Sequence, residues 1–358
     1  MPSPAPARPP LPLRRRLLFA AIPLLALLLL GEVAVRAVRA PLHFGSVRDL
    51  RTDLLKRNYP AAKDPQLGYV PKAGFASRDN HWGTLVSIDA DGLRRNGPNP
   101  PPPGERVVVC VGDSFTFGDE VDDDASWPAQ LEQTIAKPVK NGGVFGYSFA
   151  QAALRAEQLI ARFPTSDVVL AFIPDDLTRC EFERRYTPNP WFDLEGEGLA
   201  LRGVPIDHDA PHPDPSKPWK DALGHSALLD AILANTARRW WFENEKQVPV
   251  PHLVGKGGEI GKRLVVRLAA ACRERGARLL VVQLGETPRD DGTAVLAHAA
   301  AHGVATLDLI AAYQQRLAQD GSLRQRWFRG HMTREGNAWA AQQIAAALAA
   351  PARPAAPK

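Results

Sequence analysis

The residues with the clearest potential for chemistry form one turn at the end of an apolar stretch. Val107–Val111 has the length of a buried strand, and Gly112-Asp113-Ser114 follows it directly, before a segment typical of a helix start. Such a turn exposes the serine hydroxyl at the edge of a sheet, near backbone N–H groups that attract negative charge. Ser114 is therefore either a turn and cap residue or a nucleophile, and the rest of the chain must decide.

Strands and helices alternate from residue 106 onward. The predicted strands are Val107–Val111, Val139–Asn141, Asp167–Ile173, Arg278–Leu284 and Val304–Leu307. The predicted helices are Asp124–Ala136, Gln151–Arg162, Glu259–Arg275, Thr293–His302 and Arg334–Ala349. Apolar strands alternating with helices indicate a parallel sheet covered on both faces. We therefore expect an α/β fold, a flavodoxin-like three-layer α/β/α sandwich with a five-stranded parallel sheet, whose ligands bind at the carboxyl ends of the strands.

Polar and glycine-rich residues follow the predicted strands, where an active site on this architecture would lie. They are Asp113-Ser114, Gly143–Ser148, Asp175-Asp176 and Gly285-Glu286. A serine hydroxyl is too weakly acidic to attack an ester unaided, so it needs a base within hydrogen-bond reach. His331 is the candidate, because it comes just before the last helix, whose expected cap is Thr333. A loop at that position can bring the imidazole over the sheet edge toward Ser114.

Four spaced blocks, over about residues 107–340, resemble the SGNH (GDSL) hydrolase superfamily. They contain, in order, Ser114, Gly146, Asp175-Asp176 and His331. The chain before them is similar to the membrane-anchored bacterial branch of that superfamily. That part has Glu32 and Arg36 in an apolar N-terminal segment, then an Asp-Gly-Leu-Arg turn, then a proline-rich linker.

The resemblance implies a role for each matching residue. Ser114 would be the nucleophile and His331 its general base. The backbone N–H groups of Ser114 and Gly146 would form an oxyanion hole, which stabilises the charge that develops in the transition state. Glycine suits position 146 because no side chain then blocks the approach of substrate to the backbone.

Two positions depart from the superfamily's pattern. Asp175 stands where the superfamily has an asparagine that donates to the oxyanion, and an ionised carboxylate can only accept hydrogen bonds. Phe328 stands where the superfamily has an aspartate that orients the histidine. We hypothesise that Asp175 orients His331 and leaves a two-donor oxyanion hole, which predicts a slower enzyme. The rival interpretation is a Ser–His dyad with Asp175 turned away, or protonated and donating.

The N-terminus predicts a membrane anchor. Arg14–Arg16 precede the apolar stretch Leu17–Gly31, and apolar residues continue past Glu32. A bilayer needs about 20 apolar residues, so a cleaved signal peptide is the alternative, with Val38-Arg39-Ala40 as its cleavage site. The arginines at that site disfavour cleavage. Basic residues before the apolar stretch predict a single pass through the bacterial inner membrane, with the remainder of the chain in the periplasm.

Charge gives little support for nucleic-acid binding. Residues 1–40 contain six arginines and Glu32, a net charge of +5, and the whole chain also has a net charge of +5. The remainder is therefore neutral, without the basic surface that nucleic-acid binding requires.

We expect three regions along the chain. Residues 1–40 form the cytoplasmic tail and anchor, 41–105 a lead-in with the proline-rich linker, and 106–350 the SGNH-like domain. An insertion at 180–257 interrupts the alternation. It is predicted to contain a hairpin at Trp191–Leu201, a loop at Asp207–Trp219 and a helix at Leu223–Glu245. The insertion either shapes the substrate pocket or packs against the edge of the sheet.

No cofactor or metal is expected. Two histidine groups have spacings that occur at metal sites, but a solvated loop and a helix surface are the favoured interpretations. These groups are Asp207, His208, Asp209, His212 and Asp214, and the pair His298 and His302. Cys110, Cys180 and Cys272 are scattered and form no Cys-x-x-Cys pair. Trp240-Trp241-Phe242 is predicted to pack within a helix, with contact to a membrane surface as the alternative.

Taken together, the sequence predicts a membrane-anchored, periplasm-facing serine esterase. Its substrate would be an acylated carbohydrate of the envelope or a small ester, with O-acetyl as the favoured group. One alternative is an O-acyltransferase that passes the acyl group from the same serine to a polysaccharide hydroxyl. The other is a non-catalytic binding domain on the same fold.

Overall fold

The computed structural model describes residues 12–39, 45–48, 59–102, 106–210, 214–243 and 247–350. They belong to two compact units. One contains Met1–Asp53 and His212–Glu245, and the other contains Leu54–Pro211 and Lys246–Lys358. Ala40 and residues 103–105, where two of the region boundaries are predicted, lie outside the described residues, and the boundaries remain predictions.

The larger unit is built on a five-stranded sheet whose neighbouring strands are all parallel. The strands are β5 (Val107–Val111), β6 (Val139–Asn141), β7 (Thr165–Phe172), β13 (Arg278–Gln283) and β14 (Ala305–Asp308). Their order across the sheet is β14-β13-β7-β5-β6. Numbered along the chain and read from β6, this order is 2-1-3-4-5, the flavodoxin-like arrangement. The predicted fold class is confirmed.

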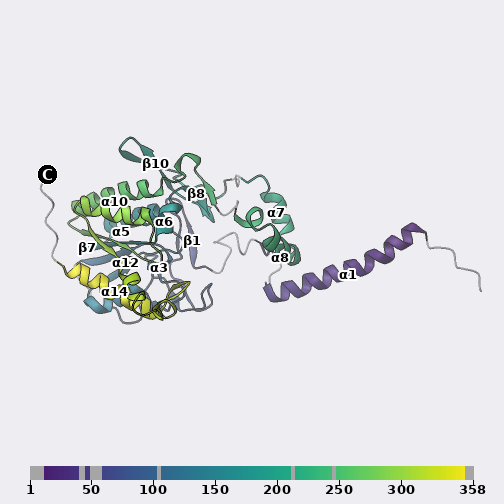
Figure 1. Ribbon diagram of the computed structural model, residues 1–358, viewed down its shortest axis with the longest axis horizontal. Coiled ribbons are helices and arrows are strands. Elements are labelled where there is room, and N and C mark those ends of the chain that lie inside the picture. Colours follow the sequence, from purple (N-terminus) through teal and green to yellow (C-terminus); the bar gives the residue numbers. More distant parts are fainter. Residues whose placement is uncertain are drawn as a thin grey trace, which may run out of the picture. The chain divides into compact units, whose positions relative to one another are not determined.

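Helices cover both faces of this sheet, so the unit has three layers (Figure 1). On one face lie α5 (Phe149–Arg162), α10 (Gly257–Glu274) and α11 (Asp290–Ala301). On the other lie α4 (Trp127–Ile135), α12 (Leu309–Leu317) and α14 (Arg334–Ala349). Alternate side chains of β5 pack against the two helical layers. Val109 and Val111 lie on the first face, and Val108 and Cys110 lie on the second. Burial on both faces explains why β5 is a continuous apolar run.

Local capping fixes where the helices begin. Ser148 and Gln151 form a reciprocal capping box at the start of α5, with distances of 3.2 and 3.0 Å. Thr333 caps α14, as predicted, by accepting a hydrogen bond from the Gly336 N–H. The helix start expected at Ser114 is present as α3 (Ser114–Phe117). Two further short helices, α6 (Pro174–Arg179) and α13 (Leu323–Trp327), were not predicted, because they are too short for a periodic pattern.

The segment before β5 belongs to the same unit as the sheet. It contains the hairpin of β1 (Ala61–Asp64) and β2 (Gly68–Pro71) and the pair β3 (Ala76–Ser77) and β4 (Val86–Ser87). Tyr69 from this segment is buried against Phe145, Tyr147 and Phe117 from the rim. The segment therefore contributes to the core beneath the candidate site.

Part of the insertion also belongs to the larger unit. The predicted hairpin is present as β10 (Trp191–Glu195) and β11 (Gly198–Arg202). The remaining elements are β8 (Phe182–Arg185), β9 (Thr187–Pro188), β12 (Gln247–Pro249) and the 3₁₀ turn η3 (Pro251–Leu253). Near the end of the chain, β15 (Phe328–Arg329) and β16 (His331–Met332) form a short hairpin.

The smaller unit is helical. It contains α1 (Leu13–Arg39), α7 (Lys217–Leu223), α8 (Ala227–Thr236) and a π-helical turn at Arg239–Glu243. At 1.5 Å per residue α1 is about 40 Å long, more than the ~30 Å of a bilayer's hydrocarbon core, and it is apolar enough to cross one. The single helix predicted over Leu223–Glu245 is instead interrupted, because α8 ends at Thr236.

Candidate active site

Ser114 is the first residue of α3, directly beyond the carboxyl end of β5. The Asp113 carboxylate caps α3 by accepting a hydrogen bond from the Phe115 N–H at 2.9 Å. Gly118 ends the helix in the left-handed conformation, with φ of +89°. A Cβ atom at position 118 would lie 2.5 Å from Cβ of Ser126, so only glycine fits at the end of this helix. The short helix holds Ser114 at the rim, where the sequence places it.

His331 is brought to Ser114 by the hairpin before α14. Its Nε2 lies 2.9 Å from Ser114 Oγ, although the two residues are 217 positions apart in the sequence. The imidazole also packs against the Phe115 ring, with centroids 5.1 Å apart. At 2.9 Å from Ser114 Oγ, His331 Nε2 is close enough to accept the proton of the serine hydroxyl.

Glu120 occupies the other side of the imidazole. Its Oε1 lies 3.2 Å from His331 Nδ1, so a proton on Nδ1 can be donated to the carboxylate while Nε2 accepts from Ser114. Glu120 has a φ of +66°, a left-handed conformation that is unfavourable for a residue with a side chain. Strained residues of this kind concentrate at functional sites. The His331 imidazole therefore contacts the Ser114 hydroxyl through one nitrogen and the Glu120 carboxylate through the other.

The contact expected between Asp175 and His331 is not formed. Asp175 is the second residue of α6, its side chain is 68% exposed, and its Oδ1 lies 3.2 Å from the Arg289 guanidinium. The carboxylate that contacts His331 Nδ1 is that of Glu120. Asp175 points to Arg289 because α6 begins directly after β7 and presents this carboxylate to solvent rather than toward the imidazole.

Asp119 is a second carboxylate close to the histidine. It is buried, its Oδ2 lies 3.8 Å from His331 Nε2, and its Oδ1 has no hydrogen-bond partner within the described part of the chain. Burial raises the pKa of Asp119 well above its usual range. Asp119 therefore favours its neutral form more than an exposed aspartate does.

Two arginines, Arg94 and Arg179, hold the loops of the rim together. Arg94, from the Asp-Gly-Leu-Arg turn, donates to the carbonyl oxygens of Phe117 at 2.7 Å and Val121 at 2.6 Å. The loop that carries Asp119 and Glu120 is therefore fixed at both ends. Arg179 joins three strand ends by contacting Asp113, Asp176 and the Tyr147 carbonyl oxygen, the last at 2.9 Å.

Gly146 lies in the loop beyond β6, with a φ of +74°. A Cβ atom at this position would lie 3.0 Å from the Tyr69 hydroxyl, and the Gly146 carbonyl accepts a hydrogen bond from Arg185 at 2.7 Å. The backbone N–H groups of Ser114 and Gly146 have no acceptor among the residues that the structure describes. Both donors therefore stay available to a ligand.

A pocket of about 600 Å³ opens beside His331 and Glu120. Its lining is largely charged and polar, and includes Arg78, Arg326, Arg329 and Arg334. Arg329 lies directly opposite His331 in the β15–β16 hairpin, and within the described ranges its guanidinium has no carboxylate partner. The other three arginines pair with carboxylates near the pocket.

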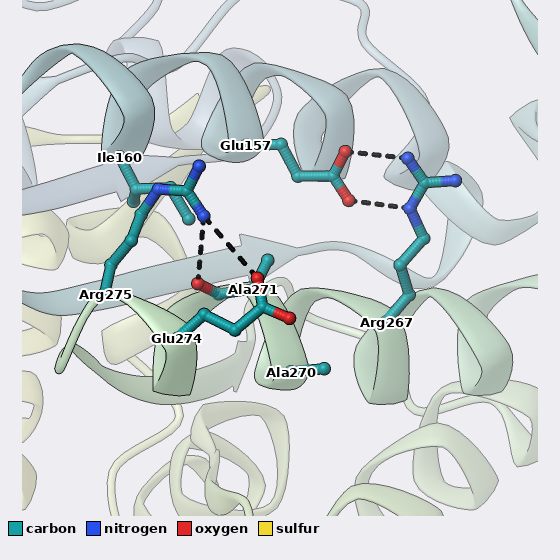
Figure 2. Close-up of a pocket in the computed structure, with 7 residues that line it drawn as sticks. All are labelled: Glu157, Ile160, Arg267, Ala270, Ala271, Glu274 and Arg275. Atoms are coloured by element: carbon teal, nitrogen blue, oxygen red, sulfur yellow. Dashed lines mark hydrogen bonds and ion pairs between the residues drawn. The ribbon is translucent and has the colours of Figure 1, made fainter.

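A second depression lies between α5 and α10, away from these residues (Figure 2). Its charged groups are paired with one another. Arg267 contacts Glu157 through two hydrogen bonds of 2.7 and 2.8 Å, and Arg275 lies 4.0 Å from Glu274. With their charges already satisfied, these side chains offer little to a ligand.

The histidines considered as metal ligands have other contacts. His208 Nε2 lies 3.2 Å from the Asp64 carbonyl oxygen, and His298 packs against His302 with ring centroids 4.2 Å apart. In the described ranges no three His, Cys, Asp or Glu side chains gather as a metal site would require, and His212 lies outside these ranges. Cys110, Cys180 and Cys272 are buried and unpaired.

No protein-family model matches the chain. No curated protein matches it either. Among solved structures, it is similar to a protein assigned to the lipolytic G-D-S-L family from Desulfitobacterium hafniense DCB-2, with a TM-score of 0.35 and 15% identity over 67% of this chain and 98% of that one. It is also similar to TesA, with a TM-score of 0.33 and 14% identity over 68% of this chain and 98% of that one.

Proposed function

We propose that this chain is a serine esterase of the SGNH type, in which Ser114 is the nucleophile, His331 the general base and Glu120 the acid that orients it. The observation that carries the proposal is the 2.9 Å contact between His331 Nε2 and Ser114 Oγ. A serine that served only as a cap would need no imidazole at its hydroxyl.

The reaction proceeds through an acyl-serine intermediate. His331 takes the Ser114 proton as Oγ attacks the carbonyl carbon of the ester, and the N–H groups of Ser114 and Gly146 stabilise the resulting oxyanion. The intermediate collapses, the C–O bond to the alcohol breaks, and His331 protonates the departing oxygen. Water, deprotonated by His331, then attacks the acyl-serine. The bond between the acyl carbon and Ser114 Oγ breaks, His331 returns the proton to Oγ, and the carboxylic acid is released. Glu120 holds the imidazole in the required tautomer and stabilises its cationic form.

The pocket favours a hydrophilic ester. Sites for long acyl chains are lined mainly by apolar and aromatic side chains, whereas this lining is dominated by arginines and carboxylates. We therefore propose an acylated carbohydrate, with a short O-acyl group such as O-acetyl, as the substrate class. The guanidinium of Arg329 lies opposite His331 and has no carboxylate partner among the described residues, so it is suited to a hydroxyl or carboxylate of such a glycan.

The proposed location follows from the N-terminal helix. α1 is long and apolar enough to span a membrane, and Arg14–Arg16 mark its cytoplasmic end under the positive-inside rule. We propose a single pass through the bacterial inner membrane with the hydrolase unit in the periplasm, where envelope glycans are accessible.

The experiment is labelling of the detergent-solubilised full-length protein with a fluorophosphonate probe, which reacts with activated serines. We expect labelling of the wild type, its loss in Ser114→Ala, and its retention in Ser148→Ala, which removes a serine that caps a helix near the same rim. No labelling of the wild type would contradict the proposal and favour a binding domain.

Product analysis then separates hydrolysis from transfer. With a synthetic acetyl ester as donor, an esterase releases acetate whether or not a soluble oligosaccharide is present. Acetate release that falls while acetylated oligosaccharide accumulates would identify the chain as an acyltransferase that uses the same serine.

A further inference from the structure

The exposed large apolar side chains of this chain are unevenly distributed. Outside α1, five of the seven in the described residues lie within 214–243. These five are Trp219, Leu223, Leu229, Ile232 and Trp240. The larger unit has about three times as many residues as the smaller one, and its described part contributes only Leu85 and Val254. Soluble proteins rarely have a cluster of exposed apolar side chains unless a partner covers it, so we expect this segment to contact a partner.

The segment is attached to α1 through polar contacts. Glu32 accepts hydrogen bonds from the backbone N–H groups of Ala227 and Leu228, both at 2.9 Å, and from the Ser226 hydroxyl at 2.7 Å. A carboxylate at the start of α8 is stabilised by the unpaired N–H groups and the helix dipole. Glu32 would be costly in a membrane helix without such partners, and α8 supplies them.

Further contacts fix the direction of α8 along α1. Leu228 packs onto Gly31, where an added Cβ atom would lie 3.3 Å from its side chain, so the glycine lets the two helices approach closely. Asp230, two residues after Leu228, lies 3.6 Å from Arg39 and also accepts a hydrogen bond from Trp241 at 2.9 Å. α8 therefore lies against the part of α1 that runs from Gly31 to Arg39.

The length of α1 indicates where that part lies in a bilayer. The uninterrupted apolar stretch Leu17–Leu30 accounts for about 21 Å at 1.5 Å per residue, which is less than the ~30 Å hydrocarbon core. α1 can span the core only if the segment after Gly31 also enters the membrane. α8 then lies at the depth where the hydrocarbon meets the headgroups.

The exposed side chains of α8 suit that depth. Leu229 and Ile232 are spaced three residues apart, so they share one face of the helix, and both are exposed. Trp219 and Trp240, which stay exposed nearby in the chain, are of the residue type enriched at membrane interfaces.

We infer that residues 214–243 form a second membrane-contacting element, in which α8 lies in the interface of the bilayer that α1 crosses and places Leu229 and Ile232 among the lipids. This element is separate from the Ser114 site, and its test does not depend on catalysis. The insertion would then serve attachment to the membrane, in addition to the pocket or the sheet edge that the sequence suggested.

The test uses full-length protein in nanodiscs of phosphatidylethanolamine and phosphatidylglycerol. Ile232→Cys carries an environment-sensitive fluorophore, and Leu229→Cys provides a second position on the same face. Val254→Cys is the matched control, since Val254 is an exposed apolar residue of the larger unit. The native cysteines are buried, and the unsubstituted protein measures their background labelling.

We expect the fluorophore at positions 229 and 232 to show blue-shifted emission. Lipids with a nitroxide near the headgroup should quench it severalfold more strongly at these two positions than at position 254. Emission typical of water, with quenching no stronger than at position 254, would overturn the inference, since α8 would then face solvent or await a protein partner. Stronger quenching by nitroxides deep in the acyl chains would also overturn it, because α8 would lie within the core rather than at the interface.

Discussion

Two acidic segments at the rim of the sheet have similar sequences and different environments. Asp119-Glu120 follows α3, and Asp175-Asp176 opens α6. Each pair has one buried carboxylate, Asp119 or Asp176, and one more exposed carboxylate. Burial raises the pKa of both buried groups. The exposed members differ, because Glu120 contacts the imidazole while Asp175 contacts Arg289.

The difference shows that backbone direction decides which carboxylate reaches the histidine. Glu120 is turned toward His331 by its left-handed backbone, in a loop that Arg94 holds at both ends. Asp175 is fixed by the helix that it begins, and that helix continues from β7. The resemblance to the superfamily drew attention to Asp175, but the local backbone brings Glu120, rather than Asp175, to the imidazole.

The largest effect is expected at His331, the residue on which this comparison depends. His331→Ala removes the base, and we expect kcat for acetyl ester hydrolysis to fall by about 10²–10⁴-fold, the usual contribution of general base catalysis. His298→Ala, a histidine on α11, is the control and should retain activity. Equal activity of the two variants would exclude the Ser114–His331 pair as the catalytic centre.

The second prediction contrasts the two exposed carboxylates directly. Replacing a buried triad aspartate by asparagine costs about 10⁴-fold in kcat. Glu120 is 42% exposed, so water can partly replace it, and Glu120→Gln should lose about 10–100-fold. Asp175→Asn should remain close to wild type because its partner is Arg289. If Asp175→Asn loses more activity than Glu120→Gln under steady-state assay, the roles assigned here are reversed.

The third prediction concerns the support of the Glu120 loop. Arg94→Ala removes the guanidinium that pairs with the buried Asp123 carboxylate and donates to the carbonyl oxygens of Phe117 and Val121. Breaking a buried pair in this way costs about 3–5 kcal/mol of unfolding free energy, measurable by denaturant titration of detergent-solubilised protein. Arg95→Ala, at the exposed neighbouring residue, is the control and should change stability little. Equal stability of the two variants would remove Arg94 from its supporting role.

The smallest effect is expected from Asp119, through its pH dependence. The pKa of Asp119 is raised in the folded state. At a pH between its ordinary pKa and the raised one, Asp119 therefore keeps a proton in the native protein that it has lost in the unfolded chain. Stability from this group is therefore present at low pH and falls as pH rises. Asp119→Asn should remove this dependence and stabilise the protein at pH 8 by about 1–3 kcal/mol relative to wild type, with a smaller gain at pH 5. A loss of stability at pH 8 would mean that ionised Asp119 is paired in the folded protein.

The fold could be predicted because its elements have strong local signals. Val107–Val111 and Arg334–Ala349 have the predicted bounds, since an apolar strand ended by a glycine and a helix capped by Thr333 are defined by nearby residues. The position of Ser114 beyond a strand and of His331 before a helix follows from those elements. Their convergence at 2.9 Å agrees with the expectation that strand ends meet at one rim.

Glu120 could not be found in the same way. Its side chain reaches His331 across 211 positions of sequence, and this contact depends on the left-handed backbone at Glu120. The only local signal is the acidic pair directly after Gly118, a glycine that ends a helix and changes the chain's direction. The contact between α8 and α1 could not be predicted from local sequence either, because Glu32 accepts hydrogen bonds from backbone groups nearly 200 positions away.

The most direct test of Ser114 as the nucleophile is to identify the residue that the substrate acylates. The full-length enzyme is mixed with an excess of an activated acetyl ester, quenched in acid at short times, digested and analysed by mass spectrometry. We expect one acetyl group on the peptide that contains Ser114, and none on that peptide in Ser114→Ala. Turnover of the ester with no acetyl group on Ser114, or with the acetyl group on another residue, would contradict this expectation.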